Sequence, residues 1–192
     1  MFIVLGMKKT LLTSIIVLVC SLGLFAQVTM KPHLSIGAEY GLTTGNLSNY
    51  YGSVVGGSLK FELPVGSPQF NLTGTIGYTA YLVRLDYYGP LILNAEQFIP
   101  LELGAKYFFT KIAYVEGDAG ISQNTQTNFT GSKTAFIYSP VIGISAPTNN
   151  HKSTIDLGLR FESRGDNHQV AVRMAYRFGP TFPAPEKPKG AK

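Results

Sequence analysis

The sequence predicts an all-β fold, an eight-stranded antiparallel up-and-down transmembrane β-barrel. Three observations lead to this prediction. The N-terminal segment is typical of exported proteins, eight later segments alternate apolar and polar residues, and only 14% of the residues are charged. Soluble domains usually contain about 25% charged residues. Alternation gives a strand one apolar and one polar face, and strands can cross lipid only when they close into a barrel.

Residues 1–26 have the features of a secretory signal peptide. A short basic start precedes an apolar run from Thr10 to Phe25, and Leu24-Phe25-Ala26 resembles a small-residue cleavage site. The run is too short for a confident spanning helix, and an uncleaved N-terminal anchor is the alternative. Cys20 is the only cysteine, so the mature chain is expected to contain no disulfide. Lipid attachment at Cys20 is disfavoured, because Val19 stands where a small residue is expected.

Eight segments between residues 27 and 178, the predicted barrel domain, alternate apolar and polar residues and are separated by turn residues. The predicted strands are His33–Leu42, Ser53–Leu63, Phe70–Leu82, Phe98–Phe109, Ile112–Ser122, Ala135–Ala146, Ser153–Glu162 and Gln169–Phe178. Pro140 lies in the sixth segment and has no N–H to donate, so we expect a bulge or a strand end there. An even number of strands suits a closed antiparallel barrel, which has no open edges.

The last segment shows the alternation most clearly. One face carries Val170, Val172, Met174, Tyr176 and Phe178. The other face carries Arg173 and Arg177, which must face water or acidic partners. An apolar face that meets lipid, opposite a face with two arginines, is typical of a strand in a membrane barrel.

The connections between the predicted strands alternate in length. Residues 43–52, 83–97 and 123–134 form long connections, and those after the second, fourth and sixth strands are shorter. Barrels of this kind have long external loops and short periplasmic turns, so both ends of the mature chain are expected in the periplasm. Residues 179–192 are rich in Pro and Lys and do not alternate, which predicts a disordered periplasmic tail.

Aromatic residues cluster near the predicted strand ends, where they would form two interfacial girdles. The expected external girdle contains Tyr50, Tyr51, Tyr87, Tyr88 and Phe98. The expected periplasmic girdle contains Tyr107, Phe108, Phe109 and Phe178.

Several segments resemble the small eight-stranded outer-membrane barrels, the porin-like family with an outer membrane protein beta-barrel domain. The resemblance rests on residues 98–107, 114–120, 155–161 and the terminal Tyr176-Arg177-Phe178, and it covers Pro32 to Phe178. It implies a location in the cell outer membrane, with lipid as a neighbour. It also implies that Tyr176 and Phe178 belong to the signal read by the barrel-insertion machinery. Here a tail follows the terminal aromatic residue.

If the apolar faces meet lipid, the polar faces fill the lumen, which in an eight-stranded barrel is just wide enough for side chains. The predicted lumen charge network comprises Glu39, Lys60, Glu62, Glu102, Lys106, Glu116, Asp156, Arg160, Arg173 and Arg177, and Asp118 and Glu162 share its face. Unpaired buried charges cost several kcal/mol, so we expect ion pairs rather than solvated charges. Arg173 is expected near Glu39, and Arg177 near Asp156.

The sequence predicts no catalytic residue, no cofactor and no metal site. The three histidines, His33, His151 and His168, are expected at opposite barrel ends, separated by about 25 Å. His33, Ser35 and Glu39 share a strand face and resemble a hydrolase constellation. However, Ser35 and Glu39 are four residues apart and cannot both touch one imidazole. The basic residues scatter over the chain, so we expect no nucleic-acid partner.

The leading functional hypothesis is an integral, non-catalytic barrel with a structural role or a role in surface interaction. Loops 43–52, 83–97 and 123–134 would contact an extracellular partner. The alternatives are a small-solute channel, a lipid-modifying enzyme, and a soluble barrel of lipocalin type. The soluble barrel would place leucine, phenylalanine and isoleucine inside and the charges outside.

Overall fold

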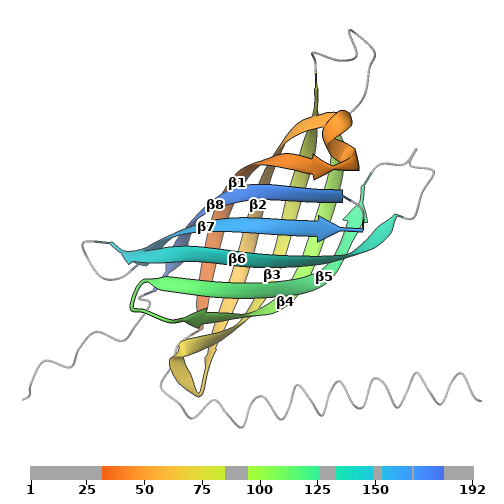
Figure 1. Cartoon of the computed structure of the whole chain (residues 1–192). Coiled ribbons are helices and arrows are strands. Elements are labelled where there is room, and N and C mark those ends of the chain that lie inside the picture. The colour runs from red at the N-terminus through yellow and green to blue at the C-terminus, as the bar shows by residue number, and fades with distance from the viewer. Residues whose placement is uncertain (1–31, 85–94, 126–132, 149–152, 166, 180–192) are drawn as a thin grey trace, which may run out of the picture. The chain divides into compact units, whose positions relative to one another are not determined.

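The computed structural model describes residues 32–84, 95–125, 133–148, 153–165 and 167–179. Its strands are β1 (His33–Gly45), β2 (Tyr51–Val65), β3 (Ser67–Val83), β4 (Glu96–Phe108), β5 (Ala113–Asn124), β6 (Thr134–Pro147), β7 (Ser153–Arg164) and β8 (Asn167–Phe178), with a 3-10 helix η1 (Asn46–Asn49) after β1. Each strand pairs antiparallel with the next, and β8 pairs with β1 (Figure 1). The eight strands therefore close into one barrel, as predicted.

The polarity of the barrel is reversed relative to a soluble protein. Large apolar side chains point outward, and Leu103, Phe136 and Met174 are 73%, 64% and 61% exposed. The buried side chains are mostly polar or charged. Burial alternates over much of each strand, and most regularly along β8. This arrangement excludes the soluble lipocalin-type alternative, because water would meet the apolar face. Within the described ranges, no helix is long and apolar enough to cross a membrane.

The strands extend further than the sequence predicts. Residues 64–69 were expected to form a connection, but pairing continues to Val65 and Ser67 with an irregular register. Gly66 alone makes the turn, with a φ of 70° that residues with a side chain rarely adopt. At the other end of the barrel, β7 continues to Arg164. The end of the barrel at which β1, β3, β5 and β7 finish is called the loop end. The opposite end, where β1 begins and β8 finishes, is called the terminal end.

Two prolines interrupt pairing without ending a strand. β6 runs through Pro140 and pairs with β5 there without a register shift. Its pairing with β7 lacks Ser139 and Pro140 and resumes at Val141 in the same register. Pro100 leaves a similar gap between β3 and β4. A missing N–H removes one ladder hydrogen bond and need not displace the chain. The prediction of a bulge or strand end at Pro140 was therefore wrong.

The aromatic girdles are only partly as predicted. Tyr50, Tyr107, Phe109 and Phe178 are exposed on the outside. By contrast, Tyr51, Phe98 and Phe108 point into the lumen and are buried. In β4, Phe98 and Phe108 share the even-numbered face with Glu102 and Lys106. The strand period thus overrode the tendency of aromatic residues to lie at the interface. Tyr87 and Tyr88 lie outside the described residues.

Candidate functional site: the closed lumen

The inner face of the described barrel collects its buried charged side chains. Seven are acidic and six are basic: Glu39, Glu62, Glu102, Glu116, Asp118, Asp156, Glu162, Lys60, Lys106, Arg160, Arg164, Arg173 and Arg177. The structure thus places every residue of the predicted network inside the barrel. Arg164 was not predicted to lie inside, because its position was assigned to a loop. Extending the alternation of the seventh segment by one period would have found it.

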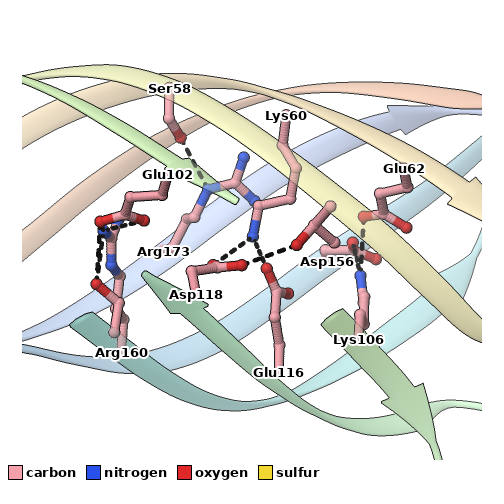
Figure 2. A network of polar contacts seen from close by, with 12 residues as sticks. Ser58, Lys60, Glu62, Glu102, Lys106, Glu116, Asp118, Asp156, Arg160 and Arg173 are labelled. Carbon is pink, nitrogen blue, oxygen red and sulfur yellow. Dashed lines mark hydrogen bonds and ion pairs between the residues drawn. The ribbon is translucent and has the colours of Figure 1, made fainter. Parts of the chain in front are cut away.

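Near the terminal end, Lys106 and Arg177 share the carboxylate of Glu62. Lys106 Nζ lies 3.0 Å from Glu62 Oε1 and 2.9 Å from Asp156 Oδ2 (Figure 2). Arg177 donates from Nη1 to Glu62 Oε2 at 2.8 Å. Ser145 accepts from Arg177 and donates to Asp156. These five residues come from five different strands, so the cluster ties the barrel wall together across the lumen.

Aromatic rings cover this terminal-end cluster. Lys106 Nζ lies 4.0 Å from the ring centroid of Tyr114 and 5.2 Å from that of Phe108. Phe108 and Tyr114 are 5.5 Å apart and pack with Val141 as an apolar cluster. The faces of aromatic rings attract cations, more strongly where water is excluded. The rings therefore both fill the lumen and stabilise the buried ammonium group of Lys106.

In the middle of the barrel, Lys60 reaches two carboxylates of β5. Its Nζ forms an ion pair with Glu116 and lies 3.6 Å from Asp118 Oδ2 (Figure 2). Thr73 Oγ1 donates to Asp118 Oδ1 at 2.8 Å. Glu116 and Asp118 are two residues apart, so they project from the same face of the strand. A single lysine from β2 thus bridges neighbouring acids on the opposite wall.

Closer to the loop end, Arg160 binds three carboxylates. Its Nη2 donates to Glu102 at 2.6 and 2.8 Å and to Glu162 at 2.8 Å. Its Nη1 lies 3.4 Å from Glu39 Oε2. Ser139 accepts a further hydrogen bond from Nη2 and donates to Glu102. The guanidinium group has five N–H donors in a fixed plane, so one arginine side chain can bind several acceptors.

A second group of aromatic residues lies beyond Arg160, toward the loop end. Tyr81 packs edge-on against Tyr51 at 6.2 Å and against Phe98 at 5.4 Å. Arg164 lies over Phe98, with Cζ 3.9 Å from the ring centroid, and donates to Glu162 at 2.7 Å. Val54 completes the apolar cluster. Aromatic groups therefore lie on both sides of the charge network.

Two specific pairings differ from prediction. Arg173 lies opposite Glu39 in the β1–β8 register, but its Nε donates to Ser58, and Glu39 pairs with Arg160. The guanidinium group lies over Gly37, where an added Cβ would come within 2.9 Å of Arg173 Cζ. Arg177 lies near Asp156 as predicted, with Ser145 Oγ in contact with both, but its ion pair is with Glu62. Long side chains reach past their nearest neighbours, so Cα register alone does not decide their partners.

Comparisons with known proteins identify the fold. No family model and no curated protein matches the sequence. Among solved structures, the attachment invasion locus protein Ail of Yersinia pestis matches with a TM-score of 0.50 and 16% identity, covering 77% of this chain and 97% of Ail. Neisserial surface protein A (NspA) matches with a TM-score of 0.54 and 14% identity, covering 77% of this chain and 96% of NspA. The chain has the fold of the small eight-stranded outer-membrane β-barrels.

A structure of Ail in a phospholipid bilayer nanodisc matches equally, with a TM-score of 0.50, 16% identity, and coverage of 77% of this chain and all of that one. The outer face of this barrel fits such an environment, because its exposed side chains are large and apolar. Tyr176 and Phe178, predicted to form the insertion signal, both lie on this face of β8. Their rings are 5.0 Å apart and edge-to-face.

The described residues contain no group of three or more side chains that could hold a metal ion. His33, Ser35 and Glu39 lie on the inner face of β1, as the alternation predicted. Ser35 is buried, and its Oγ makes no hydrogen bond with the described part of the chain. Glu39 is engaged by Arg160.

Proposed function

We propose that this chain is an integral outer-membrane protein whose lumen stays closed, and that it acts structurally or through surface interactions of its external loops. We further propose that it is neither a solute channel nor an enzyme. The observation that carries the proposal is the charge network of the lumen, which has aromatic clusters on both sides. The network joins acids and bases from opposite walls at distances of 2.6 to 3.6 Å.

The energetics of the network favour permanent closure. An aqueous path along the axis would require Lys106 and Arg160 to leave carboxylates from other strands. Breaking a buried pair by removing one partner costs about 3–5 kcal/mol, and here several pairs lie in series along the axis. Thermal motion rarely supplies that much energy for several pairs together. An eight-stranded barrel is also narrow enough for side chains alone to fill it.

Conductance in planar bilayers tests the closed lumen. Refolded protein, checked for folding by a gel of unboiled against boiled sample, is added to one side of the membrane. We expect currents no different from those of a protein-free bilayer. Discrete, reproducible conductance steps from folded protein would overturn the proposal and favour the small-solute channel.

The proposed topology places the loop end outside the cell and both ends of the mature chain in the periplasm. Residues 1–26 are proposed as a signal peptide cleaved after Ala26, and residues 179–192 as a periplasmic tail; apart from Gly179, both lie outside the described residues. Long external loops and short periplasmic turns are usual in this class of barrel. The connection between β4 and β5 is short, and that between β3 and β4 is long, which supports this orientation.

Cysteine labelling of intact cells tests the topology. Cys20 is the only native cysteine, and the proposed cleavage removes it. Tyr50→Cys lies at the loop end and Lys111→Cys in a turn at the terminal end, and both positions are exposed. A membrane-impermeant maleimide should label Tyr50→Cys and spare Lys111→Cys until the outer membrane is opened. Labelling in the reverse order would overturn the orientation.

The external loops are the proposed interaction surface. The structure describes loop 43–52 and only parts of loops 83–97 and 123–134. In loop 43–52, Tyr50 is exposed beside η1. Arg84 fixes this loop by donating to the carbonyl oxygen of Ser48 at 3.2 Å. Its backbone N–H donates to the carbonyl of Tyr50 at 3.0 Å. A loop held in one conformation presents its exposed side chains at a smaller entropic cost when a partner binds.

A further inference from the structure

An apolar hollow interrupts the outer face of the barrel over β6, β7 and β8. It has a volume of about 350 Å³ and is lined by Pro140, Val141, Ile142, Leu159, Phe161 and Val170. A second hollow of about 310 Å³ adjoins it, because Ile142 and Leu159 line both. A water molecule takes up ~30 Å³ in the liquid, so each hollow has room for several methylene groups.

The small exposed side chain of Pro140 explains why the hollow lies there. β6 and β7 do not pair at Ser139 and Pro140, and pairing resumes at Val141. Pro140 also presents a compact ring to the outside, between the larger Tyr138 and Ile142. The outer surface is therefore recessed at this point relative to both sides. The depression continues along the β6–β7 seam toward the terminal end.

A ladder of three rings stands at the loop-end side of the hollow. Tyr138 and Phe161 are 6.5 Å apart, and Phe161 stacks on His168 at 5.7 Å with an interplanar angle of 27°. His168 lies on the same face of β8 as Val170 and is one step closer to the loop end. Its Nδ1 lies 2.9 Å from Ser163 Oγ. The stacking and this contact fix the ring, and Nε2 makes no hydrogen bond to a described residue.

We propose that this hollow binds a lipid of the outer leaflet. Its acyl chain would lie along the β6–β7 seam, and its headgroup phosphate, with no further group attached, would lie at His168 Nε2. The hollow is continuous with the apolar outer face, which lies in lipid. A flexible chain can follow a shallow depression, and the imidazole tautomer with its hydrogen on Nε2 donates to a phosphate oxygen. The proposal rests on the outer-membrane location and on the orientation with the loop end outside.

Photo-crosslinking in vesicles of phosphatidylcholine with a minor share of phosphatidic acid tests the site. A diazirine analogue of leucine replaces Leu159 in the hollow or Leu103 on the outer face of β4, and it keeps the size of the side chain. We expect the ratio of phosphatidic acid to phosphatidylcholine adducts at Leu159 to exceed the vesicle ratio several-fold. Leu103 should report the vesicle ratio. Equal ratios at the two positions would overturn the proposed site.

His168→Gln separates headgroup recognition from acyl-chain packing. With the analogue at Leu159, this variant should return the adduct ratio to that of the vesicles; an unchanged ratio would refute the role of His168. Lipid adducts at Leu103 report insertion into the bilayer whatever happens at Leu159. Failure of the lipid site is thereby distinguishable from failure of the proposed membrane location, which would leave Leu103 without lipid adducts.

Discussion

Lys106 and Glu62 are 44 residues apart in the chain, yet Lys106 Nζ lies 3.0 Å from Glu62 Oε1 inside the barrel. Neither side chain is in contact with solvent to any meaningful extent. The two residues lie on β4 and β2, which are not neighbouring strands, so the pair crosses the lumen rather than running along the sheet. This contact fixes the distance between parts of the wall that share no backbone hydrogen bonds.

Lys106→Met is therefore expected to destabilise the folded barrel by about 3–5 kcal/mol, because it leaves Glu62 and Asp156 without the ammonium group. Unfolding by urea in detergent micelles, followed by the mobility of the folded band, measures the effect. Lys111→Met in an exposed turn is the matched control and should change stability by less than ~0.5 kcal/mol. Similar midpoints for the two variants would show that the network does not stabilise the barrel.

Tyr81→Ala is expected to cost about 3–5 kcal/mol, the usual range for removing a buried aromatic ring. The ring packs against both Tyr51 and Phe98 at the loop end. Tyr81→Phe keeps the packing and removes only a hydroxyl group that Arg164 approaches at 3.4 Å, so we expect a loss below ~1 kcal/mol. The same urea titration compares the two. A larger loss for Tyr81→Phe than for Tyr81→Ala would contradict a packing role.

The facing of the strands was predictable from sequence because the period of two is a property of the backbone. His33, Lys60 and Arg177 could be placed inside from alternation alone. The ion-pair partners were not predictable, since Arg173 and Arg177 have flexible side chains that reach past the residues opposite them. Arg164 was missed because the strand was ended at Glu162, where turn-forming residues begin.

Aromatic residues were harder to place than charged residues. Phe98 and Tyr51 were predicted at the lipid interface, where aromatic side chains are common. Lipid and a crowded lumen both accept a large ring, so residue type does not distinguish the two faces. In β4, Phe98 lies four residues before Glu102, so the two-residue period places both side chains on the inner face. Charged residues have no such freedom, because the lipid face excludes them.

Two glycines of β5 are expected to respond differently to Ala. A Cβ added at Gly120 would lie 2.0 Å from the carbonyl oxygen of Leu101, whereas one at Gly117 would meet nothing within 4 Å. Gly120→Ala must therefore push β4 away, at a cost of about 1–3 kcal/mol, as for overpacking. Gly117→Ala should change stability by less than ~0.5 kcal/mol. Thermal unfolding of the two proteins side by side gives the comparison, and equal stabilities would argue against close packing at Gly120.

Phe178→Ala is expected to lower the amount of assembled barrel in cells several-fold, with little effect on stability once the protein is folded. The side chain is exposed on the outer face, and Tyr176 is its ring neighbour, so its removal leaves no cavity in the lumen. Phe136→Ala removes another exposed ring, from β6, and is the control. Heat-shifted bands in outer-membrane fractions measure assembly. Equal loss in both variants would assign Phe178 a general lipid contact rather than the insertion signal.

Pro140→Ala is expected to complete the ladder between β6 and β7. The register is the same on both sides of the gap, so the new N–H at residue 140 faces β7 at the correct spacing. A ladder hydrogen bond contributes about 0.5–1.5 kcal/mol, partly offset by the greater freedom of the unfolded chain without proline, about 0.4–1 kcal/mol.

Net stability should thus change little, and hydrogen exchange is the sharper measurement. The amide of Ala at this position should exchange as slowly as that of Ile142. Exchange at the rate of an open loop would instead show that the two strands are separated at this point for reasons other than the missing donor.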